Sequence, residues 1–372
     1  MEIKGLDFKG QKFGFGCMRL PMKGGDVDIE QVKGMVDLFL ESGFNYFDIA
    51  HGYIGGKSET ALKEALTTRY PRDCYILTNK LTGYLFKKEE DILPLFQKQL
   101  EACGVEYFDL YLMHAQSAQI YEQFKRCRAY EIAYSLKEQG KIKHFGISFH
   151  DKAEVLDMIL TEHPEIELVQ IQFNYLDYED PAVQSRKCYE VCVKHSKPVV
   201  IMEPIKGGNL IKLPEDALKT VRDFGVPPQS LALRFAATPE NVVMVLSGMS
   251  SIEQMRDDIS FMKDFLPLSK EEIELTQKVS SIFKSKNMLG CTACRYCTDG
   301  CPKHISIPDL FSLYNAKKVF HDWNADYYYS QVHTVNNGKA GECIKCGKCE
   351  RICPQKLPIR ALLSDVAAEF ER

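Results

Sequence analysis

The sequence predicts an α/β protein in which a (β/α)8 TIM barrel is followed by a smaller, mainly α-helical domain. Eight short apolar runs rich in β-forming residues recur before residue 250, and segments with helical periodicity separate them. After residue 260 this alternation stops and two cysteine-rich motifs follow. Strands that alternate with helices pair in parallel. Eight such units in about 250 residues predict a closed barrel.

The eight predicted strands are mostly unbroken apolar runs, as expected for a parallel sheet that is covered on both faces. They are residues 13–20, 45–50, 74–80, 108–114, 144–149, 168–175, 198–204 and 242–248. Before them, the segment IKGLDFKGQKF predicts a small hairpin that turns at Lys9 and Gly10.

Amphipathic segments between the strands predict the helices of the barrel. They include residues 28–43, 90–104, 130–140, 152–163 and 183–195. The first of them places Val32, Val36 and Phe39 on one face, which is the spacing of a buried helix stripe. Three of the segments end in glycine, a common helix stop, at Gly43, Gly104 and Gly140.

The remainder of the chain predicts a linker and a second domain. A helix capped by Ser269 is expected over 268–287, and a mixed helical and aromatic segment over 307–333. An amphipathic helix with Pro358 near its start closes the chain. We therefore expect a barrel over 1–265, a helical linker over 266–288 and a cysteine-bearing domain over 289–372.

Composition excludes several classes of partner. The 372 residues are 45% hydrophobic and 26% charged, with a net charge of −4, so neither nucleic acid nor an anionic membrane is expected as a partner. No apolar run approaches the roughly 18 residues of a membrane span. The start, MEIKGLDFKG, lacks the apolar region of a secretory signal. We expect a cytoplasmic protein.

Fourteen cysteines fit a reducing cytoplasm better than a disulfide framework, which belongs to small secreted chains. Eight of them lie in the two motifs. We expect the other six to be buried as small hydrophobic residues. These are Cys17, Cys74, Cys103, Cys127, Cys188 and Cys192.

Four polar residues follow the predicted strands at the end of the barrel where active sites lie. Asp48 ends the second strand, Tyr53 lies in the loop beyond it, Lys80 ends the third strand and His114 ends the fourth. A polar group at a strand end is often only a cap or a turn residue. Four residues of these types at the same barrel mouth instead favour a catalytic role.

The four side chains are suited to donate a proton to a carbonyl group that is being reduced. Tyrosine has a pKa near 10, and a lysine ammonium beside it favours the phenolate and lowers that pKa. An aspartate paired with the lysine keeps it charged and in place. A histidine can hydrogen-bond the substrate oxygen and orient it.

The ordered segments FGFGCMRLP, FDIAHGY…GGKSE, LTNK, DLYLMH, GIS and SGMSSIEQ resemble those of the aldo-keto reductase family. The resemblance extends through about residue 262. It implies that Asp48, Tyr53, Lys80 and His114 form the catalytic tetrad of that family. It also implies a nicotinamide cofactor bound at the barrel mouth without a Rossmann fold. The absence of a Gly-x-Gly-x-x-Gly fingerprint after a strand agrees with this.

The resemblance assigns the cofactor contacts by motif. Ser148 and Gln170 would hold the nicotinamide carboxamide, and Gly16 and Met18 would line the floor. Pro204, Ile205 and Gly207 would run past the pyrophosphate. Gly248, Ser250, Ser251 and Gln254 would hold phosphate and ribose, where glycine and helix N-terminal N–H groups suit an anion.

Three departures from the family pattern affect the cofactor. Phe149 stands where many members have asparagine, and Glu203 stands near the usual place of the aromatic ring that stacks on nicotinamide. Asp257 and Asp258 occupy the positions that usually contact adenine. The basic residues that commonly hold a 2′-phosphate are absent, with Arg256 as the only candidate. We therefore expect NAD(H) in preference to NADP(H).

Each cysteine motif reads C-x2-C-x2-C-x3-C-P, first at 291–302 and again at 343–354. Structural zinc usually takes two C-x2-C pairs, so zinc is the weaker alternative. The spacing is typical of [4Fe–4S] clusters, and in two-cluster ferredoxins the fourth cysteine of each motif binds the other cluster. We expect one cluster on Cys291, Cys294, Cys297 and Cys353, and a second on Cys343, Cys346, Cys349 and Cys301.

The long segment between the motifs resembles the α-helical ferredoxin type. The whole arrangement resembles the iron–sulfur branch of the aldo-keto reductases found in anaerobes and archaea. We expect Trp323 and residues 327–329 to pack over the clusters or the barrel mouth, and His51 and His150 to flank that mouth.

Three functions remain open from the sequence. The first is nicotinamide-dependent reduction of a small aldehyde or ketone, or its reverse, with clusters that relay electrons to or from the site or a ferredoxin-like carrier. Nicotinamide prefers hydride, however, and the chain shows no recognised flavin site to split it into single electrons. The second is a carbonyl reductase whose clusters form a structural or oxygen-sensing lid. The third is an electron-transfer partner with a non-catalytic barrel.

Overall fold

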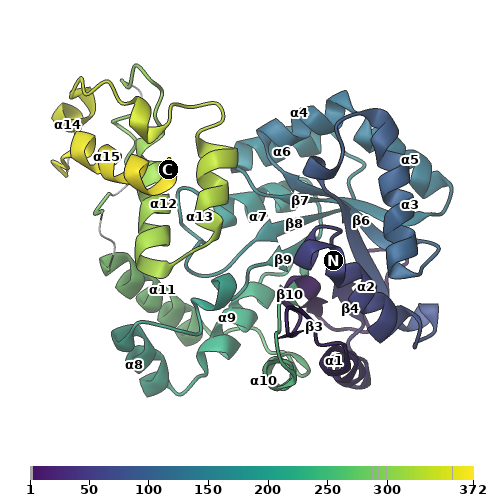
Figure 1. The fold of residues 1–372 in the computed structure, drawn as a ribbon. Coiled ribbons are helices and arrows are strands. Elements are labelled where there is room, and N and C mark those ends of the chain that lie inside the picture. Colours follow the sequence, from purple (N-terminus) through teal and green to yellow (C-terminus); the bar gives the residue numbers. More distant parts are fainter. Residues whose placement is uncertain (1–2, 287–288, 292, 299, 354) are drawn as a thin grey trace.

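The computed structural model describes residues 3–286, 289–291, 293–298, 300–353 and 355–372. Thr292, Asp299 and Pro354 of the cysteine motifs, and the last two residues of the expected linker, lie outside the described residues. The chain forms a barrel and a smaller helical part that lies beside it (Figure 1).

Eight parallel strands close into a barrel in the order β1-β10-β9-β8-β7-β6-β5-β4. They are β1 (Phe13–Gly16), β4 (Tyr46–Asp48), β5 (Ile76–Leu81), β6 (Phe108–Gln116), β7 (Ile142–Phe149), β8 (Leu168–Gln172), β9 (Val199–Met202) and β10 (Val242–Ser247). Each contains part of one predicted run, so the predicted barrel is confirmed. A two-stranded antiparallel ribbon, β2 (Met22–Lys23) and β3 (Asp26–Val27), follows β1.

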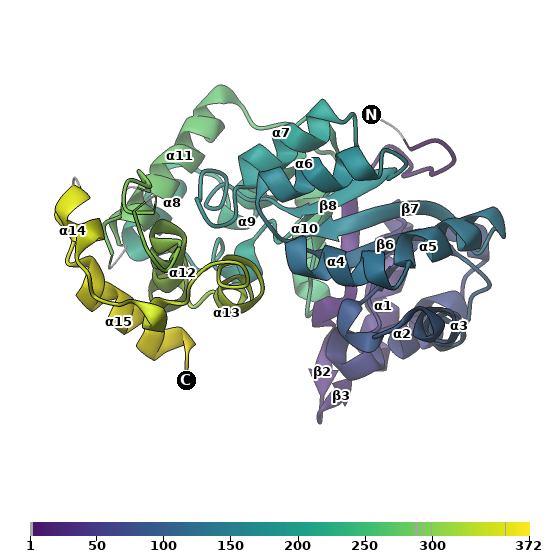
Figure 2. The same ribbon diagram turned by 90° about the horizontal axis from the view of Figure 1, so that it is seen from above.

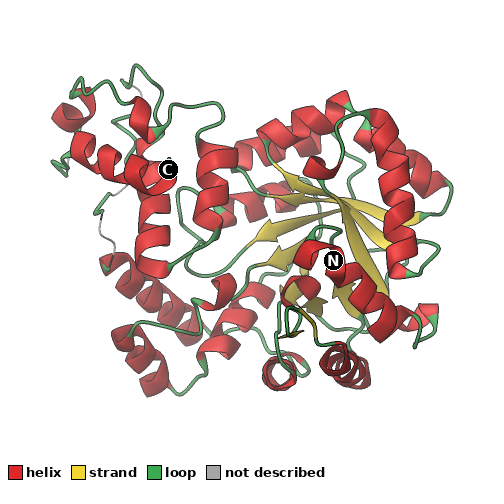
Figure 3. Cartoon of the chain, in the orientation of Figure 1, coloured by secondary structure: helices red, strands yellow, loops and turns green. Residues whose placement is uncertain are grey.

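Helices surround the strands (Figure 3). They are α1 (Ile29–Glu41), α2 (Lys57–Leu62), α3 (Ile92–Cys103), α4 (Ala118–Arg126), α5 (Ala129–Glu138), α6 (Ala153–Glu162), α7 (Ser185–Lys194), α8 (Glu215–Phe224), α9 (Pro228–Ala237) and α10 (Ile252–Met262). Helix α1 buries Val32, Met35, Val36 and Phe39, the stripe that the sequence predicts. Gly104 ends α3 with a positive φ of 65°, a conformation that glycine adopts without strain.

The predicted N-terminal hairpin is wrong. The chain does turn at Lys9 and Gly10, but residues 3–12 form no strand. Ile3 is instead buried in the cluster that fills the barrel interior, and Leu6 and Phe8 pack against the same cluster. Because that cluster includes Tyr46 and other residues at strand starts, burial of these apolar side chains at the amino end of the barrel outweighs pairing between two short strands.

The helical part follows α11 (Lys270–Ser285), whose N-terminus is a capping box of Ser269 and Glu272, as the sequence predicts for Ser269. It contains α12 (Ile307–Phe320), α13 (Asn324–Tyr327), a π-helical turn over Tyr328–His333, α14 (Lys348–Ile352) and α15 (Ile359–Phe370). We call residues 289–372 the cysteine module. Its buried cluster joins Leu310, Phe311 and Tyr328 to Ala182 and Val183 of the barrel.

The cysteine module lies beside the end of the barrel to which the strands point (Figures 1 and 2). Hydrogen bonds join the two parts. Tyr327 Oη donates to the carbonyl of Ala115, 3.3 Å away, and Ser312 Oγ donates to Asp180 Oδ2 at 2.6 Å. Within the described residues, no helix is long and apolar enough to cross a membrane.

Candidate active site and cysteine cavities

The four residues predicted as a tetrad meet at the carboxyl end of the barrel. Lys80 is fully buried on β5, and its Nζ lies 2.5 Å from Oδ1 of Asp48 and 3.2 Å from Oη of Tyr53. A third contact, 2.9 Å to the carbonyl of Ile49, fixes the ammonium group. The Tyr53 and His114 rings stand edge to face with centroids 6.1 Å apart. Two strand ends and a loop thus bring a hydroxyl, an ammonium and an imidazole to one place.

Burial is the largest influence on the ionisation of Tyr53. It raises the pKa of the hydroxyl, and the charge of Lys80, which acts in the opposite direction, does not cancel it. The expectation that Lys80 brings the pKa of Tyr53 below its ordinary value is therefore wrong in its net direction. Burial, the largest single influence, would lower the pKa of Lys80, but the charges of Asp48 and Tyr53 and the hydrogen bonds to both together outweigh it, and the pKa is raised. Tyr53 is thus a protonated hydroxyl at neutral pH, the state that a proton donor needs.

His114 is a neutral imidazole. Burial, followed by the charges of Lys80 and His150, holds its pKa well below the ordinary value. The Nδ1 atom lies 2.8 Å from Oγ1 of Thr82, and a hydroxyl that donates to Nδ1 leaves the ring proton on Nε2. In that tautomer Nε2 can donate a hydrogen bond to a substrate oxygen. Sequence reasoning missed Thr82, whose only signal is its position directly after β5.

A groove with a volume of about 390 Å³ begins at Asp48 and Tyr53 and extends to α10. Ten of the twelve residues predicted to bind the cofactor line it. They are Gly16, Met18, Gln170, Pro204, Ile205, Gly207, Gly248, Ser250, Gln254 and Asp258. Gln170 also donates from Nε2 to Oδ2 of Asp48 at 3.1 Å, so it connects the groove with the tetrad.

The structure does not place Ser148 and Ser251 among the groove-lining residues. The Ser148 hydroxyl accepts a hydrogen bond from the N–H of Ala115, and Ser251 caps α10 by accepting from the N–H of Gln254. Sequence reasoning in turn missed Arg19, Lys212 and Gln229, which line the groove. Arg19 directly follows the predicted Met18, whereas no family motif marks the other two.

The end of the groove at α10 is acidic. Asp257 and Asp258 both line it. Asp258 is buried and accepts a hydrogen bond from Ser247 Oγ at 2.7 Å. Burial, more than the nearby Asp257 charge, raises the pKa of the Asp258 carboxyl to about 7. A carboxyl group that ionises near neutral pH therefore lies where the adenosine half of a dinucleotide is expected.

The eight cysteines of the motifs surround two small cavities. Cys291, Cys294, Cys297 and Cys353 line one, and Cys301, Cys343, Cys346 and Cys349 line the other. Ile307 contributes to both walls. A [4Fe–4S] cluster is held by four cysteine thiolates, and the residues present fit that group. Among the described residues, no three Cys, His, Asp or Glu side chains converge closely enough to hold a single metal ion.

The fold and the site define a barrel oxidoreductase with an added cysteine module, and the comparisons with known proteins agree. A model of the aldo/keto reductase family matches residues 12–281, and a model of a 4Fe-4S dicluster domain matches residues 290–358. The chain therefore belongs to the aldo/keto reductase family, is an oxidoreductase of that type, and carries a 4Fe-4S dicluster domain after the barrel.

Two curated relatives are similar over most of their own length. The NADH-specific methylglyoxal reductase of Escherichia coli (strain K12) is 22% identical over 288 residues, which cover 64% of this chain and 85% of that protein. The uncharacterized oxidoreductase YqkF of Bacillus subtilis (strain 168) is 24% identical over 305 residues, which cover 73% of this chain and 93% of that protein.

Solved structures show the same fold. The holo form of the aldo-keto reductase AKR11C1 from Bacillus halodurans is 26% identical, with a TM-score of 0.58, and covers 72% of this chain and 91% of its own. An aldo-keto reductase from Klebsiella pneumoniae in complex with NADPH is 18% identical, with a TM-score of 0.58 and coverage of 72% and 90%.

Proposed function

We propose that the protein reduces a small aldehyde or ketone to an alcohol, or catalyses the reverse reaction, with a nicotinamide cofactor in the groove. The observation that carries the proposal is the buried contact of Tyr53 with Lys80 and Asp48 at the end of that groove. Oxidation of NADH in the presence of a panel of small aldehydes and ketones tests it. Failure with every carbonyl compound would instead favour a barrel that only senses nicotinamide.

Each residue of the site has a distinct role in this proposal. His114 Nε2 hydrogen-bonds the substrate oxygen and holds the carbonyl carbon towards the groove. Tyr53 Oη donates its proton to that oxygen as negative charge develops on it. Lys80, held by Asp48, stabilises the phenolate that remains on Tyr53. The bound cofactor supplies the hydride, and Gly16, Met18 and the other groove residues named above would hold it.

We propose that the cofactor is NAD(H) rather than NADP(H), because the groove near α10 presents Asp257 and Asp258 to the adenosine half. A 2′-phosphate would be repelled by these carboxylates. The pKa of Asp258, about 7, gives the preference a pH dependence. Below that pH the carboxyl group gains a proton and the repulsion weakens.

We therefore expect the ratio of kcat/KM for NADH to that for NADPH to exceed about tenfold at pH 8 and to fall at pH 6. Steady-state assays with each cofactor at both pH values measure it. Asp258→Asn should remove most of the pH dependence of the ratio. A preference for NADPH at both pH values would contradict the assignment.

We propose that the cysteine module holds two [4Fe–4S] clusters with crossed ligation, one in each cavity. Bound clusters would move single electrons, and the thiolates that hold them would join the two ends of the module. All fourteen cysteines lie in the described part of the chain and none forms a disulfide. We also propose a reducing, cytoplasmic location, because a chain with so many cysteines and two cluster-type motifs is not typical of a small secreted disulfide scaffold.

Electron exchange between the clusters and the barrel is a second candidate function, favoured by one cavity. A space of about 370 Å³ between the two parts is lined by Cys291 on one side and by Asp177 and Lys206 on the other. Ile205 and Gly207, which flank Lys206 in the sequence, line the cofactor groove. Oxidation of one NADH to NAD+ releases one proton and two electrons. Each of the two clusters could accept one of these electrons.

Anaerobic addition of NADH alone tests this exchange. Loss of the visible cluster absorbance and a new electron spin resonance signal would support it, with a ferredoxin or another one-electron carrier as partner. Clusters that stay oxidised with NADH but accept electrons from a strong reductant would favour the structural or oxygen-sensing lid.

A further inference from the structure

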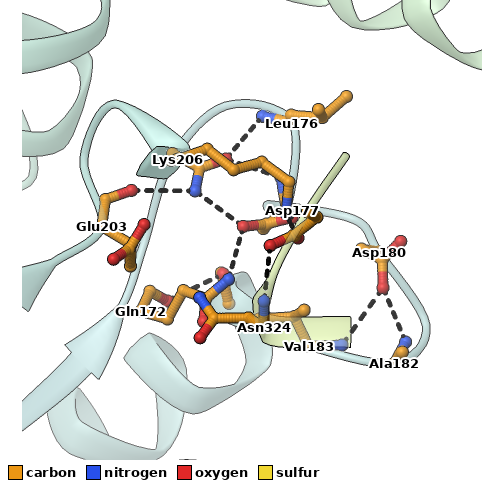
Figure 4. A network of polar contacts seen from close by, with 12 residues as sticks. Gln172, Leu176, Asp177, Asp180, Ala182, Val183, Glu203, Lys206 and Asn324 are labelled. Atoms are coloured by element: carbon orange, nitrogen blue, oxygen red, sulfur yellow. Dashed lines mark hydrogen bonds and ion pairs between the residues drawn. The ribbon is translucent and has the colours of Figure 1, made fainter. Parts of the chain in front are cut away.

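A segment of the cysteine module is anchored to the loop that forms one wall of the cofactor groove. Lys206 Nζ, buried between the two parts, lies 2.7 Å from Oδ1 of Asp177 and 2.7 Å from Oδ2 of Asp322. Asp322 belongs to the turn between α12 and α13, and its Oδ1 accepts from the N–H of Asn324 at 3.0 Å. Figure 4 shows this network with Asp177 and Lys206 at its centre. The turn of the module is therefore fixed against residues 203–208.

This anchor places Trp323 at the rim of the groove. A Cβ atom added to Gly207 would lie 3.4 Å from Nε1 of Trp323, so the indole rests against a residue of the groove wall. The guanidinium carbon of Arg19 lies 5.9 Å from the indole centroid. The side chain of Trp323 remains 48% exposed, so it is not held there by burial in a core.

Arg19 reaches across the groove from the opposite side. It follows β1, whereas Glu203 follows β9, and β10 lies between these two strands in the barrel. The Arg19 stem lies over Gly248, which follows β10, with Cδ 3.3 Å from the position of an added Cβ. Its Nη2 lies 3.6 Å from Oε1 of Glu203, which is beyond hydrogen-bond length. The guanidinium thus crosses the carboxyl end of β10, and its N–H groups donate no hydrogen bond to any residue in the part of the chain that the structure describes.

We propose that Arg19 and Trp323 form a clasp over the bound dinucleotide, so that the cysteine module supplies part of the cofactor site. This rests on the proposed function, in which a nicotinamide dinucleotide lies in the groove. The pyrophosphate is an anion, and the Arg19 guanidinium can turn its donors from the loosely held Glu203 to the phosphate oxygens. The indole covers the guanidinium, attracts it through its π face and limits its contact with water. The dinucleotide then leaves only when the clasp opens.

The rate of NADH dissociation from the full-length, cluster-loaded protein tests the clasp. NADH fluorescence in a stopped-flow displacement by excess NAD+ measures it. We expect Trp323→Ala and Arg19→Gln each to accelerate dissociation about tenfold, which lies between the effects of a fully exposed and a desolvated cation–π contact. Trp323→Phe retains a π face and should have a smaller effect. The double variant should be about as fast as the single variants, because residues that act together do not add.

A matched control comes from the same module. Ile352 is an exposed apolar residue on α14, which lies on the side of the module away from the barrel in Figures 1 and 2. Ile352→Ala should release NADH at the native rate.

Iron content is measured for every variant to show that the cysteine module is folded and loaded. If Trp323→Ala disturbs the folding of the module, Arg19→Gln still tests the clasp, because it leaves the sequence of the module unchanged. Unchanged dissociation in the Trp323 and Arg19 variants, or fully multiplicative effects in the double variant, would overturn the clasp. If the native protein binds no NADH at all, the proposed function fails instead.

Discussion

Replacing Tyr53 with phenylalanine should lower kcat for carbonyl reduction by about a thousandfold while the Kd for NADH stays within about twofold. The change removes one hydroxyl and keeps the ring. That hydroxyl is the group in the site that burial keeps protonated, and it lies 3.2 Å from Lys80. Because it donates its proton only as the carbonyl is reduced, its loss affects the chemical step and not the binding of the cofactor.

Tyr84→Phe is the matched control, because it removes the hydroxyl of an exposed tyrosine whose Oη lies close to Gly52, next to Tyr53. Its kcat should stay near the native value. A pH profile adds a second readout. The raised pKa of Tyr53 predicts a reduction rate that is constant through neutral pH and falls only in alkaline solution, whereas alcohol oxidation, which needs the phenolate, should rise with pH. Retained turnover in Tyr53→Phe would exclude this residue as the proton donor.

Replacing Cys301 and Cys343 together with serine should remove one cluster and leave the other. These two cysteines line the same cavity although they belong to different motifs. With crossed ligation, about four of about eight iron atoms per chain should remain. Replacing Cys291 and Cys301, which belong to one motif but line different cavities, should remove both clusters.

The two double variants are matched controls for each other, because each removes two thiols. Iron content and electron spin resonance of the reduced proteins, prepared without oxygen, distinguish them. Uncrossed ligation predicts the reverse order, with both clusters lost from Cys301→Ser/Cys343→Ser and one retained in Cys291→Ser/Cys301→Ser. Bound zinc in place of iron in the native protein would contradict the cluster assignment altogether.

The barrel could be predicted from the sequence because its signals are local. Each strand is a short apolar run, and a helix stop such as Gly104 is visible in the sequence itself. Asp48 and Lys80 could be predicted to meet because parallel strands end at one edge of the barrel. The hairpin prediction failed because burial of Ile3 depends on a cavity that forms only when eight strands close.

The contacts between the two parts of the chain could not be predicted from local patterns. Lys206 and Asp322 are far apart in the sequence, and nothing in the segment around Lys206 indicates that it pairs with Asp322. Arg19 and Trp323 meet where that ion pair holds the turn after α12 against the groove wall. The direction of the shift in the pKa of Tyr53 could not be predicted for a related reason: the sequence shows the neighbouring charge of Lys80 but not the extent of burial, which has the larger effect.

The most direct test of the account is the fate of the hydride. NADH with deuterium at the transferred position of nicotinamide C4 is supplied, without oxygen, with a carbonyl compound that the enzyme reduces. We expect the alcohol to carry deuterium on the former carbonyl carbon, because in the proposed site the nicotinamide lies beside Tyr53 at the end of the groove. An alcohol formed without deuterium, while the clusters are reduced and reoxidised, would show that electrons reach the substrate singly and would contradict direct hydride transfer in the barrel.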